Sequence, residues 1–162
     1  MNRRVRRLIR EYGGEVMPFR DLPKPAQLAM AWYMAINGEA WELPGEYDPY
    51  GGGLAQIRED LPKMLPHFVK KYGKKKFGLV RIPTDALIDS IMQDDEMKGQ
   101  FKKFSEYHRW YVNQGHMPRH DTRNRWPVIL SDFENETLQD GWHRFHDYVR
   151  QGADVIPALY YA

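Results

Sequence analysis

The chain has 162 residues, 42% of them hydrophobic and 14% aromatic, which is enough for one domain with a packed core. Its formal net charge of +2 neither requires nor excludes a nucleic-acid partner. The absence of cysteine excludes thiol catalysis, disulfides and cysteine-ligated zinc, and no apolar run approaches the ~18 residues of a membrane span. We therefore expect a cytoplasmic protein with no membrane partner.

The first part of the chain, residues 1–76, predicts a helical N-terminal region. Helices are expected over residues 2–12, 26–36 and 54–72. The first is amphipathic, with apolar side chains on one face and arginines on the other, and two glycines end it. The third contains Pro62 and Pro66, and we expect it to be broken near them because proline removes a helical hydrogen bond.

The second part, residues 77–162, predicts a small mixed sheet with helices, so the expected fold class is α+β. Strands are expected over residues 79–82, 126–130, 136–139 and 155–161. Helices are expected after a cap at Thr84 or Asp85, over residues 95–113 and over residues 142–151. The two parts form either separate domains or one compact unit.

The turn over residues 138–144, with the sequence Leu-Gln-Asp-Gly-Trp-His-Arg, is the most informative segment. Asp140 is suited to cap the following helix, and Gly141 lets the backbone turn tightly. The first amides of a helix have no intrahelical partner and attract anions. His143 and Arg144 are cations at the end of the helix where cations are unfavourable, unless an anion offsets them. The alternative is an ordinary turn with both side chains in solvent.

The order of motifs along the second part resembles the core of the ParB/sulfiredoxin superfamily. In that family, a strand that starts with proline and hydrophobic residues leads to a "DG-x-HR" turn, an amphipathic helix, a glycine and an "IP-hydrophobic" strand. The matching segments here are 127–130, 138–144, Tyr148 with Gly152, and 155–159, preceded by 80–88 as the opening strand and helix. The resemblance covers about residues 78–162 and implies a ParB/sulfiredoxin-like fold with a nucleotide-phosphate pocket.

The resemblance also implies roles for individual residues. Carried over by position, Asp140, His143 and Arg144 would be the catalytic residues of an enzyme. The residues that would hold the cofactor, ATP or a similar nucleotide with or without Mg²⁺, are Gly141, Trp142, His143, Arg144 and Arg125. Trp142 stands where sulfiredoxins carry their cysteine, so sulfiredoxin activity is excluded.

Two functions follow from the resemblance. The first is a nucleotide-dependent phosphotransferase or hydrolase, and the second is a non-catalytic antirestriction protein of a phage or plasmid. The second would bind DNA or a protein partner through the basic helix over 2–12 and the lysine run over 70–76. Whether the chain turns a nucleotide over stays open.

Two features have alternative explanations. His116, His120 and Asp121 could bind a metal, but their spacing fits no zinc pattern and a solvated loop explains them as well. Trp142 could stack on a base, although its spacing from Phe145 and Val149 favours packing in the core. No metal ligand is therefore assigned.

Overall fold

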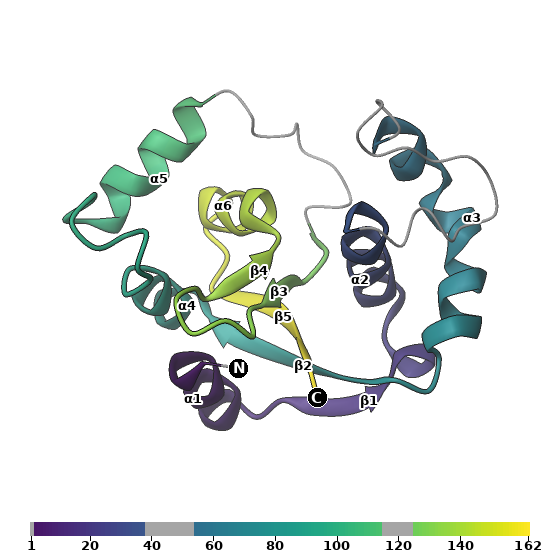
Figure 1. Ribbon diagram of the computed structural model, residues 1–162. Helices are drawn as coiled ribbons and strands as arrows, with labels where there is room; N and C mark the ends of the chain where they lie inside the picture. The colour runs from purple at the N-terminus through teal and green to yellow at the C-terminus, as the bar shows by residue number, and fades with distance from the viewer. Residues whose placement is uncertain (1, 38–53, 115–124) are drawn as a thin grey trace.

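The computed structural model describes residues 2–37, 54–114 and 125–162 (Figure 1). Its helices are α1 (Arg3–Tyr12), the 3-10 turn η1 (Phe19–Asp21), α2 (Lys24–Ile36), α3 (Leu54–Tyr72), α4 (Thr84–Ile91), α5 (Phe104–Asn113) and α6 (Trp142–Arg150). Its strands are β1 (Glu15–Pro18), β2 (Lys76–Pro83), β3 (Val128–Leu130), β4 (Leu138–Asp140) and β5 (Val155–Tyr161). The α+β class is confirmed.

The strands form one sheet in the order β1-β2-β5-β3-β4. The last strand of the chain, β5, lies in the middle, antiparallel to β2 and parallel to β3. Its seven residues all pair with β2, from Val155 opposite Pro83 to Tyr161 opposite Phe77. β4 is an edge strand that pairs antiparallel with β3, so the turn into α6 begins at the edge of the sheet.

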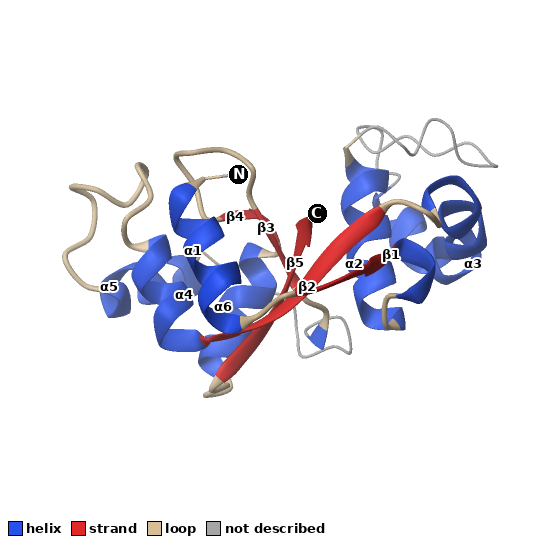
Figure 2. Cartoon of the chain, turned by 90° about the horizontal axis from the view of Figure 1, so that it is seen from below, coloured by secondary structure: helices blue, strands red, loops and turns tan. Residues whose placement is uncertain are grey.

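Both faces of the sheet are covered by helices, which produces two cores. Figure 2 shows α2 and α3 on one side of the strands and α1, α4, α5 and α6 on the other. Along β5, Leu159 joins the core with α2 and α3, whereas Ile156 and Ala158 join the core with the other four helices. Successive side chains of a strand point to opposite faces, so one strand supplies both cores.

The strand β1 was not expected from the sequence, which indicated helix and loop for this region. It has four residues, and its first two side chains are exposed. No alternation of apolar and polar residues therefore indicates a strand here. Its hydrogen bonds to β2, with Val16 opposite Gly78, place it at the second edge of the sheet. The predicted boundary at residue 76 falls at the start of β2, and strands from both sides of it share one sheet.

The helix α1 is held against the rest of the fold by polar side chains. Asn2 caps it by accepting a hydrogen bond from the amide of Val5 at 2.8 Å. The Asn2 amide donates to the carbonyls of Phe133 and Glu136, in the loop between β3 and β4. The predicted amphipathic pattern is confirmed, since Val5 and Leu8 are buried.

The carboxylate of Asp94, which is 2% exposed, joins three segments. Arg4 of α1 donates to it at 2.6 Å. Thr137, next to β4, donates its amide at 3.1 Å and its hydroxyl at 2.6 Å. Burial raises the pKa of Asp94, while the hydrogen bonds from Thr137 and the charge of Arg4 act in the opposite direction.

The prediction of a helix over 95–113 was wrong in its first half. The structure has turns there, and α5 begins at Phe104. Gly99 adopts a φ of 80°, a left-handed conformation that cannot continue a right-handed helix. The periodic apolar residues Met97 and Phe101 still pack against the core, which is why the pattern resembled one long helix.

Two further details differ from expectation. The helix α3 continues through Pro62 and Pro66, which lie four residues apart on its exposed side, where water can satisfy the freed carbonyls. The helix α4 is not capped by Thr84 or Asp85, because Pro83 precedes it and makes no side-chain cap. The hydroxyl of Thr84 donates instead to the carbonyl of Ala153, before β5.

Replacing Asp94 with alanine should lower the free energy of unfolding by roughly 3 kcal/mol, because Arg4 and the Thr137 amide lose their acceptor. The matched control is Asp95→Ala, whose exposed carboxylate lies 3.5 Å from Lys98 and should contribute less than about 0.5 kcal/mol. Urea unfolding followed by circular dichroism measures both variants. Equal losses would contradict a special role for the buried carboxylate.

Candidate functional site

The turn from β4 into α6 forms through Gly141, whose φ of 94° and ψ of 23° lie in the left-handed region. Gly141 is the residue that caps the helix, and it has no side chain to bond the first amides. The expectation that Asp140 caps the helix was wrong, because Asp140 is the last residue of β4. The amides of residues 142–144 therefore have no intrahelical acceptor and no capping side chain from Gly141.

Arg144 is the central charged group of this turn, and it is 8% exposed. Its Nη2 lies 3.5 Å from Oδ2 of Asp140, a long contact for an ion pair. Its Nε is buried and has no hydrogen-bond partner within the described residues. Burial lowers the pKa of Arg144, and Asp140 and Tyr148 raise it, but a guanidinium stays charged in proteins.

Gly141 is required by its surroundings as well as by its φ. A Cβ at this position would lie 2.8 Å from Nη2 of Arg144 and 3.1 Å from the Cα of Val128. The guanidinium therefore packs directly against the glycine of its own helix end. The structure places Asp140, Gly141 and Arg144 in contact at this turn.

The other predicted ligand-binding residues lie around this group. Trp142 is partly buried and packs against the core beneath α6, as its helical spacing predicts. His143 is exposed, and its Nδ1 lies 3.0 Å from the hydroxyl of Tyr111 on α5. Arg125 is exposed just before β3. Its neighbour Trp126 accepts a hydrogen bond at its carbonyl from the hydroxyl of Tyr148 on α6, at 2.9 Å.

Acidic groups border the same turn on its β4 side. Burial raises the pKa of Tyr33 on α2, and Asp140, Glu136 and Asp132 add to this effect by their charges. A hydrogen bond to the side chain of Gln139 acts in the opposite direction. Asp140 itself faces Nη2 of Arg144, so an anion at this turn would have to bind the Nε side of the guanidinium and the amides of residues 142–144.

A histidine pair joins α5 to α6, and sequence reasoning missed it. His146 is completely buried, and its Nδ1 lies 2.8 Å from Nδ1 of His108. The ring of Tyr111 stacks on His146 with centroids 3.8 Å apart. Burial lowers the pKa of His146 to about 3, and the charges of His108 and His143 act in the same direction. Thirty-eight residues separate the pair, so no local pattern could reveal it.

No group of three or more histidine, aspartate or glutamate side chains suited to a metal ion occurs among residues 2–37, 54–114 and 125–162. The predicted alternative with His116, His120 and Asp121 lies outside the described residues. None of the helices in the described part of the chain is long and apolar enough to cross a membrane.

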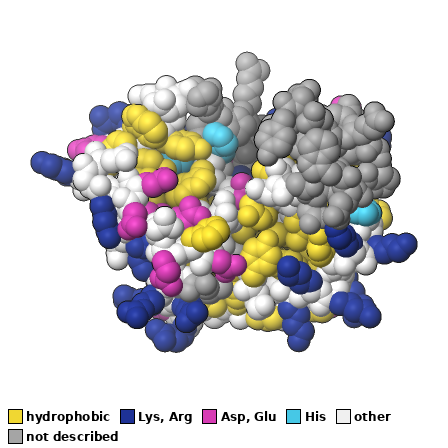
Figure 3. Space-filling view, in the orientation of Figure 1, with side chains coloured by type: hydrophobic (Ala, Val, Ile, Leu, Met, Phe, Trp, Pro, Cys, Tyr) yellow, Lys and Arg dark blue, Asp and Glu magenta, His cyan; other side chains and the backbone are white. Residues whose placement is uncertain are grey.

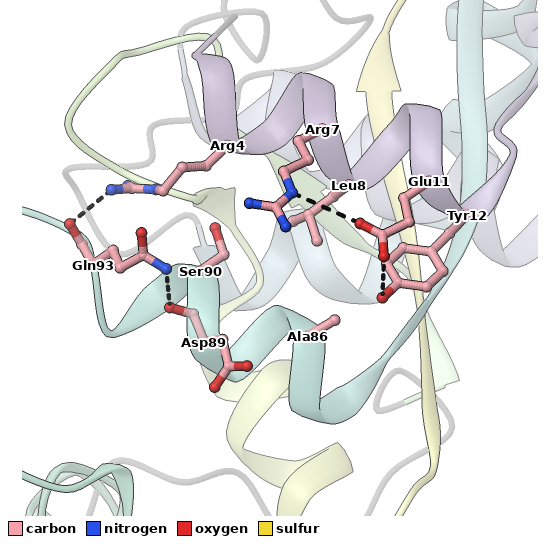
Figure 4. Close-up of a pocket in the computed structure, with 9 residues that line it drawn as sticks. All are labelled: Arg4, Arg7, Leu8, Glu11, Tyr12, Ala86, Asp89, Ser90 and Gln93. Atoms are coloured by element: carbon pink, nitrogen blue, oxygen red, sulfur yellow. Dashed lines mark hydrogen bonds and ion pairs between the residues drawn. The ribbon is translucent and has the colours of Figure 1, made fainter.

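A pocket of about 300 Å³ lies between α1 and α4, away from the turn (Figure 4). Its lining residues are Arg4, Arg7, Leu8, Glu11, Tyr12, Ala86, Asp89, Ser90 and Gln93. Both arginines already have acceptors, because Arg4 bonds Asp94 and Arg7 lies 3.8 Å from Glu11. With Asp89 also on its wall, this pocket is less suited to an anion than the turn at Arg144.

Comparison with known proteins identifies no relative. No family model matches the chain. No curated protein and no solved structure matches it either.

The histidine pair predicts how stability depends on pH. His146 is neutral in the folded protein, whereas it titrates near pH 6.5 when unfolded, so the unfolded state binds more protons below that pH. Stability should fall as the pH drops from 7 to 5, with His146 contributing on the order of 2 kcal/mol. The test is urea unfolding at both pH values.

The matched variant for this test is His146→Phe, which keeps a flat ring against Tyr111 and cannot be protonated. Its stability should fall less than that of the wild type between pH 7 and 5. An identical pH dependence in the two proteins would show that other groups cause the loss.

Proposed function

We propose that the protein binds the phosphate groups of a nucleotide at the N-terminal end of α6. The observation that carries the proposal is the buried guanidinium of Arg144, whose Nε has no partner within the described residues beside uncapped helix amides. Burying a charged group is costly unless it is paired, and its contact with Asp140 is long, at 3.5 Å. A phosphate would supply the missing acceptor and would also complement the helix dipole.

Two further features support a phosphate over a small neutral ligand. His143 and Arg125 are exposed and carry donors close to the turn. We also propose a ParB/sulfiredoxin-like arrangement for the part of the fold from β2 to β5. The order of elements there is compatible with the resemblance to that superfamily.

The proposed function is binding, and turnover is a further step with its own requirements. A phosphotransferase or hydrolase needs a base or a metal ligand near the phosphates. Asp140 is the carboxylate in contact with Arg144, so it is the residue we assign to that role. Mg²⁺ would have to be held mainly by the nucleotide, as is common for this ion.

The first test is a thermal-shift titration with ATP, ADP, CTP and GTP, with and without Mg²⁺. A nucleotide at 100 times its Kd should add about 2.7 kcal/mol of stability. Phosphate release is measured on the same samples. If no nucleotide changes the Tm at millimolar concentration, the proposed function is wrong.

Arg144→Ala should weaken nucleotide binding by roughly 1.5–3 kcal/mol, because it removes a charge-assisted contact. His143→Ala is the second variant. This residue is exposed, and its loss leaves the contact between Arg144 and Asp140 intact. The matched control is Arg109→Ala on α5, an exposed arginine that should leave affinity unchanged. Calorimetry on samples that retain the wild-type circular dichroism spectrum measures the effect. Unchanged affinity in folded Arg144→Ala and His143→Ala proteins would move the site elsewhere.

Trp142→Phe separates packing from ligand contact at the same turn. Because Trp142 packs against the core, the substitution should cost about 1 kcal/mol of stability and leave nucleotide affinity nearly unchanged. Lost affinity at an unchanged Tm would show instead that the indole faces the ligand.

A further inference from the structure

A second positively charged surface lies at the junction of α3 and β2, around Gly73. There the chain forms a pocket of about 500 Å³, which we call the Gly73 pocket. Its lining residues are Arg20, Val69, Lys70, Lys71, Gly73, Lys74 and Lys75. Five of these seven are cations and none is acidic. Figure 3 shows Lys and Arg side chains standing out at the lower right of the molecule, near the lower end of α3.

The pocket is assembled by the fold and not by the lysine run alone. The amide of Arg20, in η1, donates to the carbonyl of Gly73 at 3.2 Å. The amide of Phe19 donates to the carbonyl of Lys75 at 2.8 Å. These two hydrogen bonds hold Arg20, which lies about fifty residues earlier in the chain, against the end of α3. The result is a concave surface with positive charge on more than one wall.

Four of the five cations of this surface have no carboxylate partner among the residues that the structure describes. Arg20, Lys70, Lys74 and Lys75 make no ion pair with any residue in the part of the chain that the structure describes. The nearest acidic residue in sequence is Asp21, which is exposed. The arginines of the pocket between α1 and α4 differ in this respect, because they have acidic partners.

Aromatic rings lie among these lysines. The Nζ of Lys75 lies 5.0 Å from the centroid of the Tyr161 ring, and that of Lys71 lies 5.1 Å from the Tyr72 ring. Both tyrosines are partly exposed. A phosphate would compete with a ring for the ammonium group, and the ring would then present its face to a base.

We propose that the Gly73 pocket and the lysines around it bind the backbone of single-stranded nucleic acid. Cations in a groove beside partly exposed aromatic rings suit a single strand, since phosphates and unpaired bases are contacted together. A membrane surface fits less well, because the exposed large apolar residues Val16, Trp110 and Phe133 do not line the pocket. This proposal is independent of nucleotide binding at Arg144.

The test is fluorescence anisotropy with a labelled 20-nucleotide single strand of mixed sequence, titrated at 50 and 200 mM NaCl. The triple variant with Lys70, Lys74 and Lys75 changed to Gln should bind about tenfold more weakly at 50 mM NaCl. The slope of log affinity against log salt should decrease by about 2, since each lost contact to a single strand contributes about 0.7.

The matched control removes the same charge from another surface. Arg3, Arg6 and Arg10 are exposed on α1, and changing all three to Gln leaves the same net charge as the lysine variant. This control should keep at least half of the wild-type affinity. Equal losses in the two variants would overturn the proposal, because they would show attraction to the overall charge alone.

Two other results would also overturn it. The first is binding of the corresponding duplex as tightly as the single strand. The second is sedimentation with phosphatidylserine vesicles that depends on the three lysines while the oligonucleotide does not bind, which would identify a membrane surface instead. An Arg144→Ala protein should retain oligonucleotide binding, so this proposal and the proposed nucleotide site can fail separately.

Discussion

The strand β5 lies in the middle of the sheet, and the other elements are arranged around it. This strand is the last in the chain, yet it lies between β2 and β3 and has no solvent-exposed edge. Both of its faces carry apolar side chains, so helices must cover both sides of the sheet. To reach that position the chain must leave the edge strand β4, cross through α6 and return. The tight turn at Gly141 and the uncapped amide end of α6 are consequences of that path.

Polar side chains fix the segments that the sheet alone would leave loose. Asn2 and Arg4 bind α1 to the β3–β4 loop and to Asp94, and Thr137 binds the same carboxylate from the other side. These contacts join the first turn of the chain to the strand that precedes the candidate site. The N-terminal helix therefore supports the geometry of the β4–α6 turn without contributing a side chain to it.

The two proposed binding surfaces are cationic for different physical reasons. At the β4–α6 turn, one guanidinium is buried and lacks a full set of acceptors, which favours a single well-defined phosphate group. At the Gly73 pocket, several exposed cations share a concave surface whose described lining residues include no carboxylate, which favours an extended backbone of many phosphates. The small net charge of the chain does not reveal these two cationic surfaces, because acidic residues of the β3–β4 loop and elsewhere balance the total charge.

Elements whose signals are local could be predicted from the residues alone. Hydrophobic period predicted α1, β2, β5 and α6, and the Asp-Gly pair predicted the turn, since such patterns need no distant residue. The strand β1 could not be predicted, because Glu15–Pro18 shows no alternation of apolar and polar residues. It forms a strand through its pairing with β2. The pattern of apolar residues also placed the start of α5 too early, since Gly99 breaks a helix only through its own backbone conformation. Three contacts are visible only in the folded chain: Arg144 buried against Gly141, His146 paired with His108, and Arg20 beside the lysines at Gly73. These features depend on contacts between distant segments of the chain or on the direction of one side chain. The local spacing of residues does not encode such contacts or directions.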